Sequence, residues 1–449
     1  MRALALALLL LLPAAAAGQE RMALAGGRVV TNMGPVIEGG TVLVAGGRIE
    51  RVLPAGAPVP PGYRVVEAAG RWVTPGIVAG MTQLGLSEVT GGADANDTRA
   101  PGSPVSAALS AAAAFNPEET SIPITRRAGV TAAAVTPFPG GSIFAGQGLL
   151  ISLADGRTRP LRARAFQYVA LGSRGGQIAG GARTAAWAEL LNGLEEARRL
   201  GTGLAMPLRD QHRDLRITRE DAEALAQVLG GAQPLLVRVD RASDIRQVLR
   251  LPETYPGLRL VLVSANEGWM VADEIARARV PVVTLGMDNL PASFDQVAAT
   301  MNNVGRLVAA GVPVALGTPD LDASFQPRLL TQYAGNLVAQ GRIPGGVGLS
   351  WDQAFAAISR VPADIFGLAD RGRLAPGAAA DIVLWSGDPL ELSSYPERVW
   401  IDGVEQPLET RQSLLARRYL PGRDRERLPE GYRREGAGDA SGRVTAGAR

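Results

Sequence analysis

Short apolar runs alternate with longer amphipathic segments along the middle of the chain. Runs of about four to eight apolar and β-branched residues are typical of buried strands, whereas apolar positions three and four residues apart indicate helices. Amphipathic stretches such as AAWAELLNGLEEARRL and TREDAEALAQVL separate the apolar runs. The runs that we interpret as strands are Gly76–Gln83, Val130–Thr136, Phe166–Leu171, Gly203–Met206, Leu235–Asp240, Leu258–Ala265, Val280–Leu285 and Val312–Gly317.

Eight strands that alternate with helices predict an α/β fold, a (β/α)8 TIM barrel over residues 74–371. Thr218 and Asp221 form a capping box that starts one helix, and Ser243 is the expected N-cap of another. An open doubly wound sheet is the alternative fold. Such a sheet normally has a G-x-G-x-x-G turn after its first strand, and GMTQLG does not match it.

Both ends of the chain have a different, β-rich pattern. Residues 22–73 contain short alternating runs separated by Gly-Gly pairs, and residues 372–410 contain further strand runs. Asp402-Gly403 is typical of a type I′ hairpin turn. Each flank is too thin to bury a core alone, so we expect the two flanks to form one composite β-sandwich domain.

The first residues have the pattern of an export signal. Arg2 precedes an apolar stretch, and small residues at Ala15 and Ala17 fit a cleavage site, which predicts a signal peptide at residues 1–17 and a periplasmic or secreted protein. No later apolar run reaches the ~20 residues of a membrane span, so none is expected after cleavage. The polar, Gly-rich residues 422–449 are interpreted as a disordered tail.

Composition restricts the chemistry further. The 449 residues include no cysteine and one histidine, and all 46 basic residues are arginine, so thiolate catalysis and a histidine-rich zinc site are excluded. Arginine alternates with Asp and Glu along most of the chain, which argues against a nucleic-acid partner. His212 lies in the charged stretch RDQHRDLR and is interpreted as a solvated surface residue rather than a general base.

The motifs GGRIERV, VTPGIVAG, AGVPVALGTPD and RGRLAPGAAADIVLWSGDPLEL resemble the amidohydrolase superfamily, closest to its exported imidazolonepropionase-like members, over about residues 22–410. The resemblance implies a metal-bearing barrel with a composite β-sandwich, and hydrolysis of C–N bonds, commonly in cyclic amides, by a metal-activated water.

The positions that hold metal ligands in that family carry other residues here. Met81 and Gln83 stand where the resemblance implies two histidines, Arg238 stands at the fifth strand, and Ser264 stands at the sixth. The family's fourth-strand lysine has no counterpart in a chain without lysine. Of the implied ligands, the strand-eight aspartate has a plausible survivor, Asp320. We therefore expect no metal site and no cofactor, although a divalent metal is not excluded.

Two interpretations of the barrel mouth remain open. Asp320 paired with Asp240, Glu88 or Asp322 would hold a hard cation or share acid–base work, with Asp320 as the catalytic residue. Alternatively, Arg238 forms an ion pair with Asp320 or another mouth carboxylate and replaces the metal structurally. The residues expected to bind a small-molecule ligand are Arg238, Asp240, Gln83, Ser264, Trp269, Gly140 and Gly141, the glycines through a flexible loop at residues 136–153.

The resulting hypothesis is an exported amidohydrolase-family protein that has largely lost its metal ligands and is a non-catalytic or weakly active ligand-binding subunit. It would act as a homo-oligomer or beside an active homologous subunit. The alternative is a hydrolase of C–N bonds with an atypical or absent metal. The sequence leaves open whether the chain is an enzyme.

Overall fold

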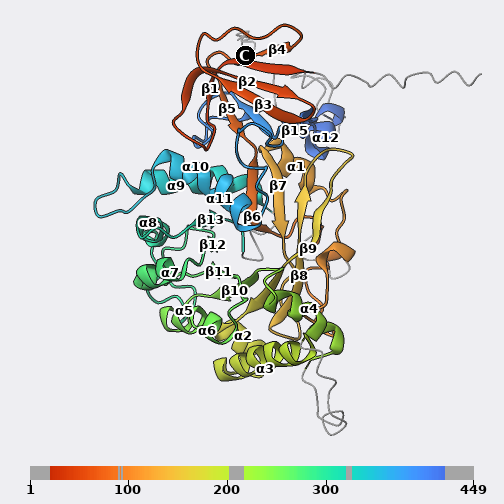
Figure 1. Ribbon diagram of the computed structural model, residues 1–449, viewed down its shortest axis with the longest axis vertical. Helices are drawn as coiled ribbons and strands as arrows, with labels where there is room; N and C mark the ends of the chain where they lie inside the picture. Colours follow the sequence, from red (N-terminus) through yellow and green to blue (C-terminus); the bar gives the residue numbers. More distant parts are fainter. Residues whose placement is uncertain (1–20, 89–91, 93–94, 202–216, 320–325, 420–449) are drawn as a thin grey trace, which may run out of the picture. The chain divides into compact units, whose positions relative to one another are not determined.

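The computed structural model shows one sheet that is built from both ends of the chain (Figure 1). Strands β5 (Trp72–Pro75) and β14 (Ile382–Trp385) pair antiparallel and join the two flanks. The Trp385 indole donates a hydrogen bond of 2.9 Å to Thr74 Oγ1 across this junction. The other strands of this sheet are β1 (Met22–Val29), β2 (Ile37–Ala45), β3 (Arg48–Leu53), β4 (Arg64–Glu67), β15 (Pro396–Ile401) and β16 (Val404–Glu405).

A second sheet of eight strands curves into a nearly closed barrel. Neighbouring strands pair in parallel, except that β8 runs antiparallel to both of its neighbours. In sheet order the strands are β6 (Ile77–Thr82), β7 (Val130–Val135), β8 (Phe144–Ser152), β9 (Arg159–Ala170), β10 (Leu235–Val239), β11 (Leu260–Ser264), β12 (Val282–Thr284) and β13 (Val314–Leu316). The predicted fold class, a barrel with a composite sheet domain, is confirmed.

Strands β13 and β6 approach each other where the barrel closes. Thr318 N donates a hydrogen bond of 2.8 Å to the carbonyl of Met81. Gly80 makes this approach possible, because a Cβ at that position would lie 2.7 Å from the carbonyl oxygen of Leu316. The side chain of Met81 is fully buried in an apolar cluster with Val78, Val263 and other strand residues. Met81 therefore packs in the core of the barrel.

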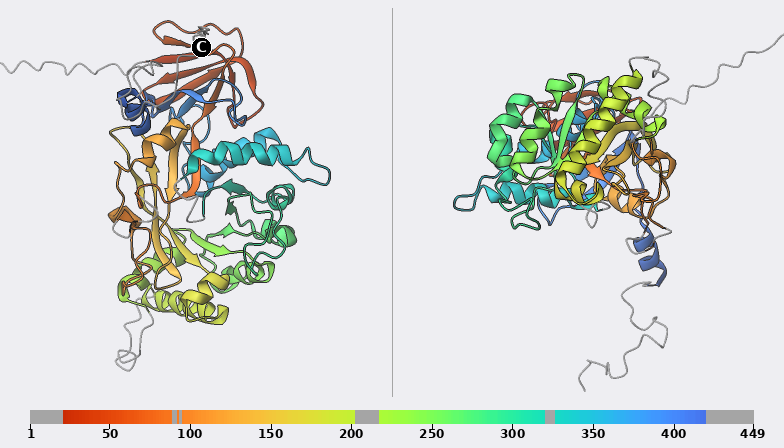
Figure 2. Two further views of the ribbon diagram at one scale, coloured as in Figure 1. Left: turned by 180° about the vertical axis from the view of Figure 1, so that it is seen from behind. Right: turned by 90° about the horizontal axis from the view of Figure 1, so that it is seen from below.

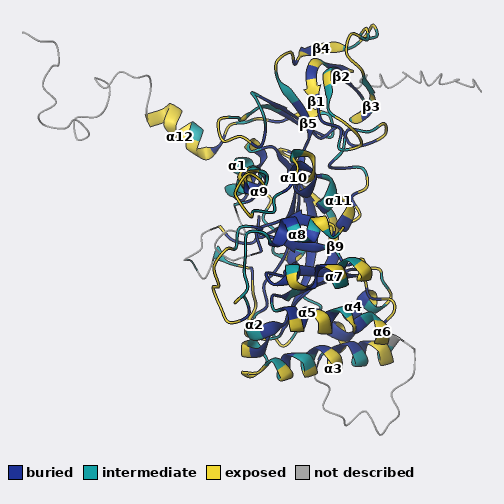
Figure 3. Ribbon diagram, turned by 90° about the vertical axis from the view of Figure 1, so that its left-hand side faces the viewer, coloured by how far each residue is buried: buried dark blue, intermediate teal, exposed yellow. Residues whose placement is uncertain are grey.

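Helices cover the outer side of the barrel sheet, as Figures 1 and 2 show. Figure 3 shows buried strands beneath helices that have one buried and one exposed face. The helices are α1 (Ser121–Arg127), α2 (Gly172–Ile178), α3 (Arg183–Gly201), α4 (Arg219–Leu229), α5 (Ala242–Leu249), α6 (Leu251–Thr254), α7 (Ala272–Ala278), α8 (Asn303–Ala309), α9 (Leu330–Gln340), α10 (Trp351–Ala357) and α11 (Arg360–Ile365), with short 3-10 helices η2 (Ala111–Ala113), η4 (Gly268–Val271) and η5 (Pro327–Leu329).

The structure describes residues 21–88, 92, 95–201, 217–319 and 326–419. The chain divides into two units, residues 1–408 and 409–449, and the described part of the second contains helix α12 (Arg411–Tyr419), which buries no residue. No helix in the described part is long and apolar enough to cross a membrane. The predicted signal peptide, the tail at residues 422–449 and the strand Gly203–Met206 lie outside the described residues.

Two local predictions are wrong. Much of the segment predicted as a glycine-rich loop at residues 136–153 forms strand β8, whose residues are all buried. Its apolar residues pack on both faces of the sheet, and this burial overrides the low strand propensity of glycine. Ser243 lies inside helix α5, whose N-cap is Arg241. The predicted cap at Thr218 is confirmed, since its side chain accepts a hydrogen bond from Asp221 N.

A buried ion pair supports the composite sheet. Arg371 contacts Asp381, and both side chains are almost completely buried. A second Arg371 nitrogen lies 2.8 Å from Asp402 Oδ1 in the β15–β16 turn, and Asp402 N donates to Asp381 Oδ1 at 2.9 Å. The guanidinium therefore compensates a carboxylate that water does not reach.

Replacing Arg371 by Met is expected to lower the free energy of unfolding by about 3–5 kcal/mol, because it leaves the carboxylate of Asp381 buried without its cation. The matched control is Arg219→Met, which removes an exposed pair with Glu223 and should cost at most about 1 kcal/mol. Urea unfolding of both variants measures the difference. Equal losses in the two variants would contradict this role of Arg371.

Candidate functional site

A polar pocket of about 360 Å³ opens at the carboxyl ends of strands β9 and β10. In a barrel of this type these strand ends and the loops that follow them form the usual site of chemistry. The loop between β12 and α8, residues 285–302, closes another side of the pocket. The lining residues are Leu171, Ser173, Arg174, Gln177, Arg238, Asp240, Asp288, Ala292, Ser293, Asp295 and Gln296.

Two of the predicted ligand-binding residues, Arg238 and Asp240, lie in this pocket. They are two positions apart at the end of β10, so their side chains leave the chain on the same side. Arg238 Nη1 donates to the carbonyl oxygen of Pro319 at 3.4 Å, just beyond strand β13. The guanidinium thus extends from β10 toward a strand end on the other side of the barrel mouth.

The carboxylate of Asp240 is held by the segment that follows the neighbouring strand β11. Asp240 is 8% exposed, and its Oδ1 accepts a hydrogen bond of 3.4 Å from Asn266 N. Ser264 and Ala265, at the end of β11, have φ values of 69° and 48°, a left-handed backbone that these residues rarely adopt. This turn brings the backbone of residue 266 toward Asp240. Ser264 itself is 3% exposed and does not line the pocket.

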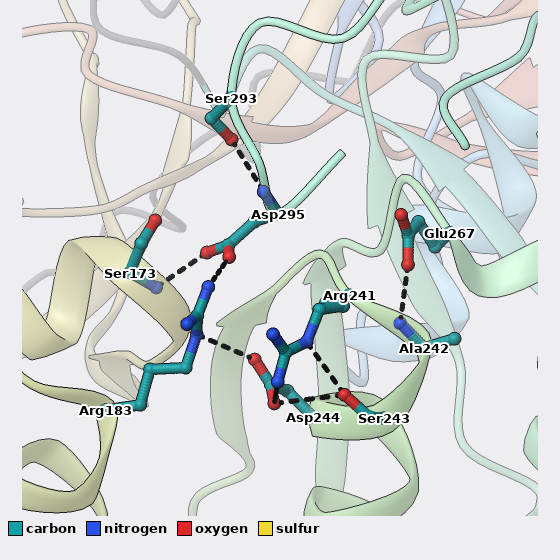
Figure 4. A network of polar contacts seen from close by, with 9 residues as sticks. All are labelled: Ser173, Arg183, Arg241, Ala242, Ser243, Asp244, Glu267, Ser293 and Asp295. Atoms are coloured by element: carbon teal, nitrogen blue, oxygen red, sulfur yellow. Dashed lines mark hydrogen bonds and ion pairs between the residues drawn. The ribbon is translucent and has the colours of Figure 1, made fainter. Parts of the chain in front are cut away.

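Asp295 joins three elements around the pocket, although the sequence analysis did not single it out. Figure 4 shows its carboxylate between Ser173 N, at 2.6 Å, and the guanidinium of Arg183. Arg183 also lies 3.4 Å from Asp244 Oδ2 on α5. Burial by itself would raise the pKa of Asp295, but the hydrogen bonds from Ser173 and the Arg183 cation offset it and hold the pKa below its usual value.

Glu267 makes a comparable connection between two loops, and Figure 4 shows its contact with Ala242. One carboxylate oxygen accepts a hydrogen bond of 3.0 Å from Ala242 N at the start of α5, and the other accepts one of 3.1 Å from Ala298 N. A carboxylate at a helix start satisfies a backbone donor that has no partner within the helix. Glu267 and Asp295 together attach the 285–302 loop to the rest of the barrel mouth.

The other predicted site residues lie elsewhere or outside the described part. Gln83 is completely buried at the end of β6 and does not line the pocket. Trp269 donates its indole N–H to the carbonyl of Ala298 at 2.9 Å and stacks against Arg306, which places it in a separate surface hollow of about 570 Å³. Asp320, Asp322 and His212 lie outside the described residues.

Gly140 and Gly141 permit a close approach of two backbone segments. A Cβ on Gly140 would lie 2.8 Å from Pro101 N, and one on Gly141 would lie 2.5 Å from the Pro101 carbonyl oxygen. Neither glycine lines the pocket. Within the described residues, packing against Pro101 accounts for both glycines.

The described residues at the mouth do not fit a divalent cation. Arg238 and Arg174 bring two guanidinium groups into the pocket, and cations repel a metal ion. The β6 positions offer a thioether in the core at Met81 and an amide at Gln83. No group of three or more His, Asp or Glu side chains with metal-binding geometry occurs in the part of the chain that the structure describes.

Comparisons with known proteins agree with this fold. The model of the amidohydrolase family matches residues 239–405. Amidohydrolase tasK of Hapsidospora irregularis is 24% identical over 400 residues, which cover 82% of this chain and 40% of that protein. The crystal structure of an amidohydrolase from Thermotoga maritima MSB8 is 24% identical with a TM-score of 0.74, and the match covers 86% of this chain and 99% of that one.

The family model and the relatives support the predicted resemblance to the amidohydrolase superfamily. A further relative, N-acyl-D-glutamate deacylase of Alcaligenes xylosoxydans xylosoxydans, is 32% identical over 165 residues, 35% of this chain and 30% of that protein. The chain thus spans less than half the length of either curated relative. The predicted superfamily is confirmed, whereas export and the loss of metal ligands stay predictions.

The lowered pKa of Asp295 predicts an acid-dependent loss of stability. Because the folded state binds this proton less readily than the unfolded state, the contribution is present above the unfolded pKa of ~3.9 and is lost as the pH falls through the lower folded pKa. The stability difference between wild type and Asp295→Asn should therefore shrink from pH 5 toward pH 2 in urea unfolding. Ser293→Ala is the control, because it removes a neighbouring hydrogen bond without removing a carboxylate. A difference that stays constant with pH would contradict this assignment.

Proposed function

We propose that this protein binds a small carboxylated molecule at its barrel mouth and that Arg238 takes the place of the family's metal ion. The observation that carries the proposal is the position of Arg238, which lines the pocket and extends from β10 to the Pro319 carbonyl. A fixed planar cation that offers several N–H donors suits a carboxylate, which accepts hydrogen bonds with two oxygens.

The pocket supports a small and oriented ligand. Its volume of about 360 Å³ is near the lower end of the usual ~300–1,000 Å³ for small-molecule sites. Arg174 brings a second cation, while Asp240, Asp288 and Asp295 bring carboxylates. Because the pocket is lined by both positively and negatively charged side chains, it selects ligands by the positions of their charged groups. An anionic group placed beside one of the carboxylates would be repelled.

In this proposal the protein is exported and has little or no catalytic activity of its own. Export rests on Arg2, the apolar run after it and the small residues at Ala15 and Ala17. Weak activity rests on the replacement of the family's histidines by Met81 and Gln83, since an unactivated water is a poor nucleophile. In this proposal the chain acts as a binding subunit, alone or beside an active homologous subunit.

Hydrolysis of a C–N bond is the second candidate, and the relatives favour it. One relative is a deacylase by name and another is an amidohydrolase. In this case Asp320, the catalytic residue expected from the sequence, would supply general acid–base chemistry. Product release from N-acyl amino acids and cyclic amides distinguishes the two functions, since the binding subunit should form no product above the uncatalysed rate.

Replacing Arg238 by Met is expected to weaken binding of a small carboxylate such as butanoate by at least about tenfold, the scale for a charge-assisted hydrogen bond. Isothermal titration calorimetry on the full-length protein measures this change. Arg250→Met is the matched control, because that side chain is 75% exposed and pairs with Glu253 away from the pocket. Unchanged affinity in the Arg238 variant, or binding lost equally in the control, would contradict the proposed site.

A further inference from the structure

The loop at residues 285–302 has two chemically different sides. Five of its residues line the polar pocket: Asp288, Ala292, Ser293, Asp295 and Gln296. Three large apolar side chains of the same loop point to solvent instead. Leu290 is 78% exposed, Phe294 is 91% exposed and Val297 is 63% exposed. Exposed apolar side chains on a loop that lines a pocket offer a contact surface for an apolar group.

Polar contacts hold this loop directly after Phe294, at Asp295 and Ala298. Asp295, the next residue, is 4% exposed and is attached to Ser173 N and Arg183. Ala298 donates to Glu267 through its N–H and accepts from the Trp269 indole through its carbonyl. Turning Phe294 into the protein would break the contacts of its neighbour, a buried carboxylate. These contacts therefore favour the outward position of the Phe294 side chain.

We propose that the ligand of this pocket is an amphiphilic carboxylate, with its charged head beside Arg238 and an alkyl or aryl tail along Leu290, Phe294 and Val297. This inference rests on the proposed function and adds the chemical class of the ligand. The pocket is small and lined mainly by polar and charged groups, with Leu171 and Ala292 as its apolar members, so it suits the head better than a tail. Leu290, Phe294 and Val297 belong to the loop that lines the pocket, so a tail that leaves the pocket along this loop would contact them.

If the tail lies along Leu290, Phe294 and Val297, the affinity of the ligand should rise with the length of the tail. Full burial of a methylene group is worth roughly a fourfold increase in affinity, and a tail with one side in water gains about twofold for each methylene. Octanoate has four methylene groups more than butanoate. We therefore expect octanoate to bind at least about tenfold more tightly than butanoate.

The test is isothermal titration calorimetry of butanoate and octanoate with the full-length protein and three variants. The double variant Leu290→Ser, Phe294→Ser should bind butanoate as wild type does and should lose most of the preference for octanoate. Leu392→Ser is the matched control, because Leu392 is equally exposed, at 79%, but lies between β14 and β15 of the composite sheet. Arg238→Met should weaken both ligands together.

The outcomes separate this inference from the proposed function. If neither carboxylate binds wild-type protein, the proposed function fails and this inference fails with it. If both bind equally well, or if the double variant keeps the full preference for octanoate, the inference alone is overturned. It is also overturned if sedimentation shows that the wild-type protein is a dimer and the double variant is a monomer. In that case a second copy of the chain would cover Leu290, Phe294 and Val297. Melting temperatures of the exposed-site variants within the range of the Leu392→Ser control show that they fold.

Discussion

The cation of Arg238 at the carboxyl end of β10 is the constraint on which the chemistry of the barrel mouth depends. Strand ends in a barrel converge, so a charged group on one of them faces the ends of the others. Arg238 donates to the Pro319 carbonyl beyond β13 and lies in one pocket with Asp240, Asp288 and Asp295. A partly buried guanidinium needs acceptors around it, and the mouth provides carbonyl and carboxylate oxygens.

The loops around this cation are held by carboxylates that bind backbone N–H groups. Asp295 accepts from Ser173 N, and Glu267 accepts from both Ala242 N and Ala298 N. These contacts connect the segments after β9, β10, β11 and β12, and β12 (Val282–Thr284) is itself a short strand with few paired positions. Pre-organised loops reduce the entropy that a ligand must remove on binding, so the mouth is suited to recognition.

Sequence patterns predicted seven of the eight strands of the barrel sheet and the pocket residues at the end of β10, because buried parallel strands are near-continuous apolar runs and a polar residue at the end of such a run is conspicuous. The turn at Asp402-Gly403 was also predicted from the sequence, and both residues have the positive φ that a type I′ turn needs. Strand β8 was missed because its glycines lower its strand propensity, while its burial on both faces becomes visible only in the fold.

No local sequence pattern marks the carboxylates that hold the loops at the barrel mouth. Asp295 lies 122 positions from Ser173, and Glu267 lies 25 positions from Ala242 and 31 from Ala298. Their roles depend on which loops the barrel brings together, and a single sequence does not give these pairings. Trp269 was predicted to bind ligand because it follows the end of a strand. The turn at Ser264 and Ala265 and the 3-10 helix η4 instead direct its ring toward Arg306.

The central claim is that an arginine has replaced the metal ion of this superfamily at the barrel mouth. The most direct test is the metal content of the full-length protein, purified without chelators, dialysed against excess Zn²⁺ and then against metal-free buffer, and measured by inductively coupled plasma mass spectrometry. The account predicts that Zn²⁺, Mn²⁺ and Fe remain far below one equivalent per chain. One equivalent or more of a divalent metal that survives dialysis, and that is lost when Asp240 is replaced by Asn, would contradict it.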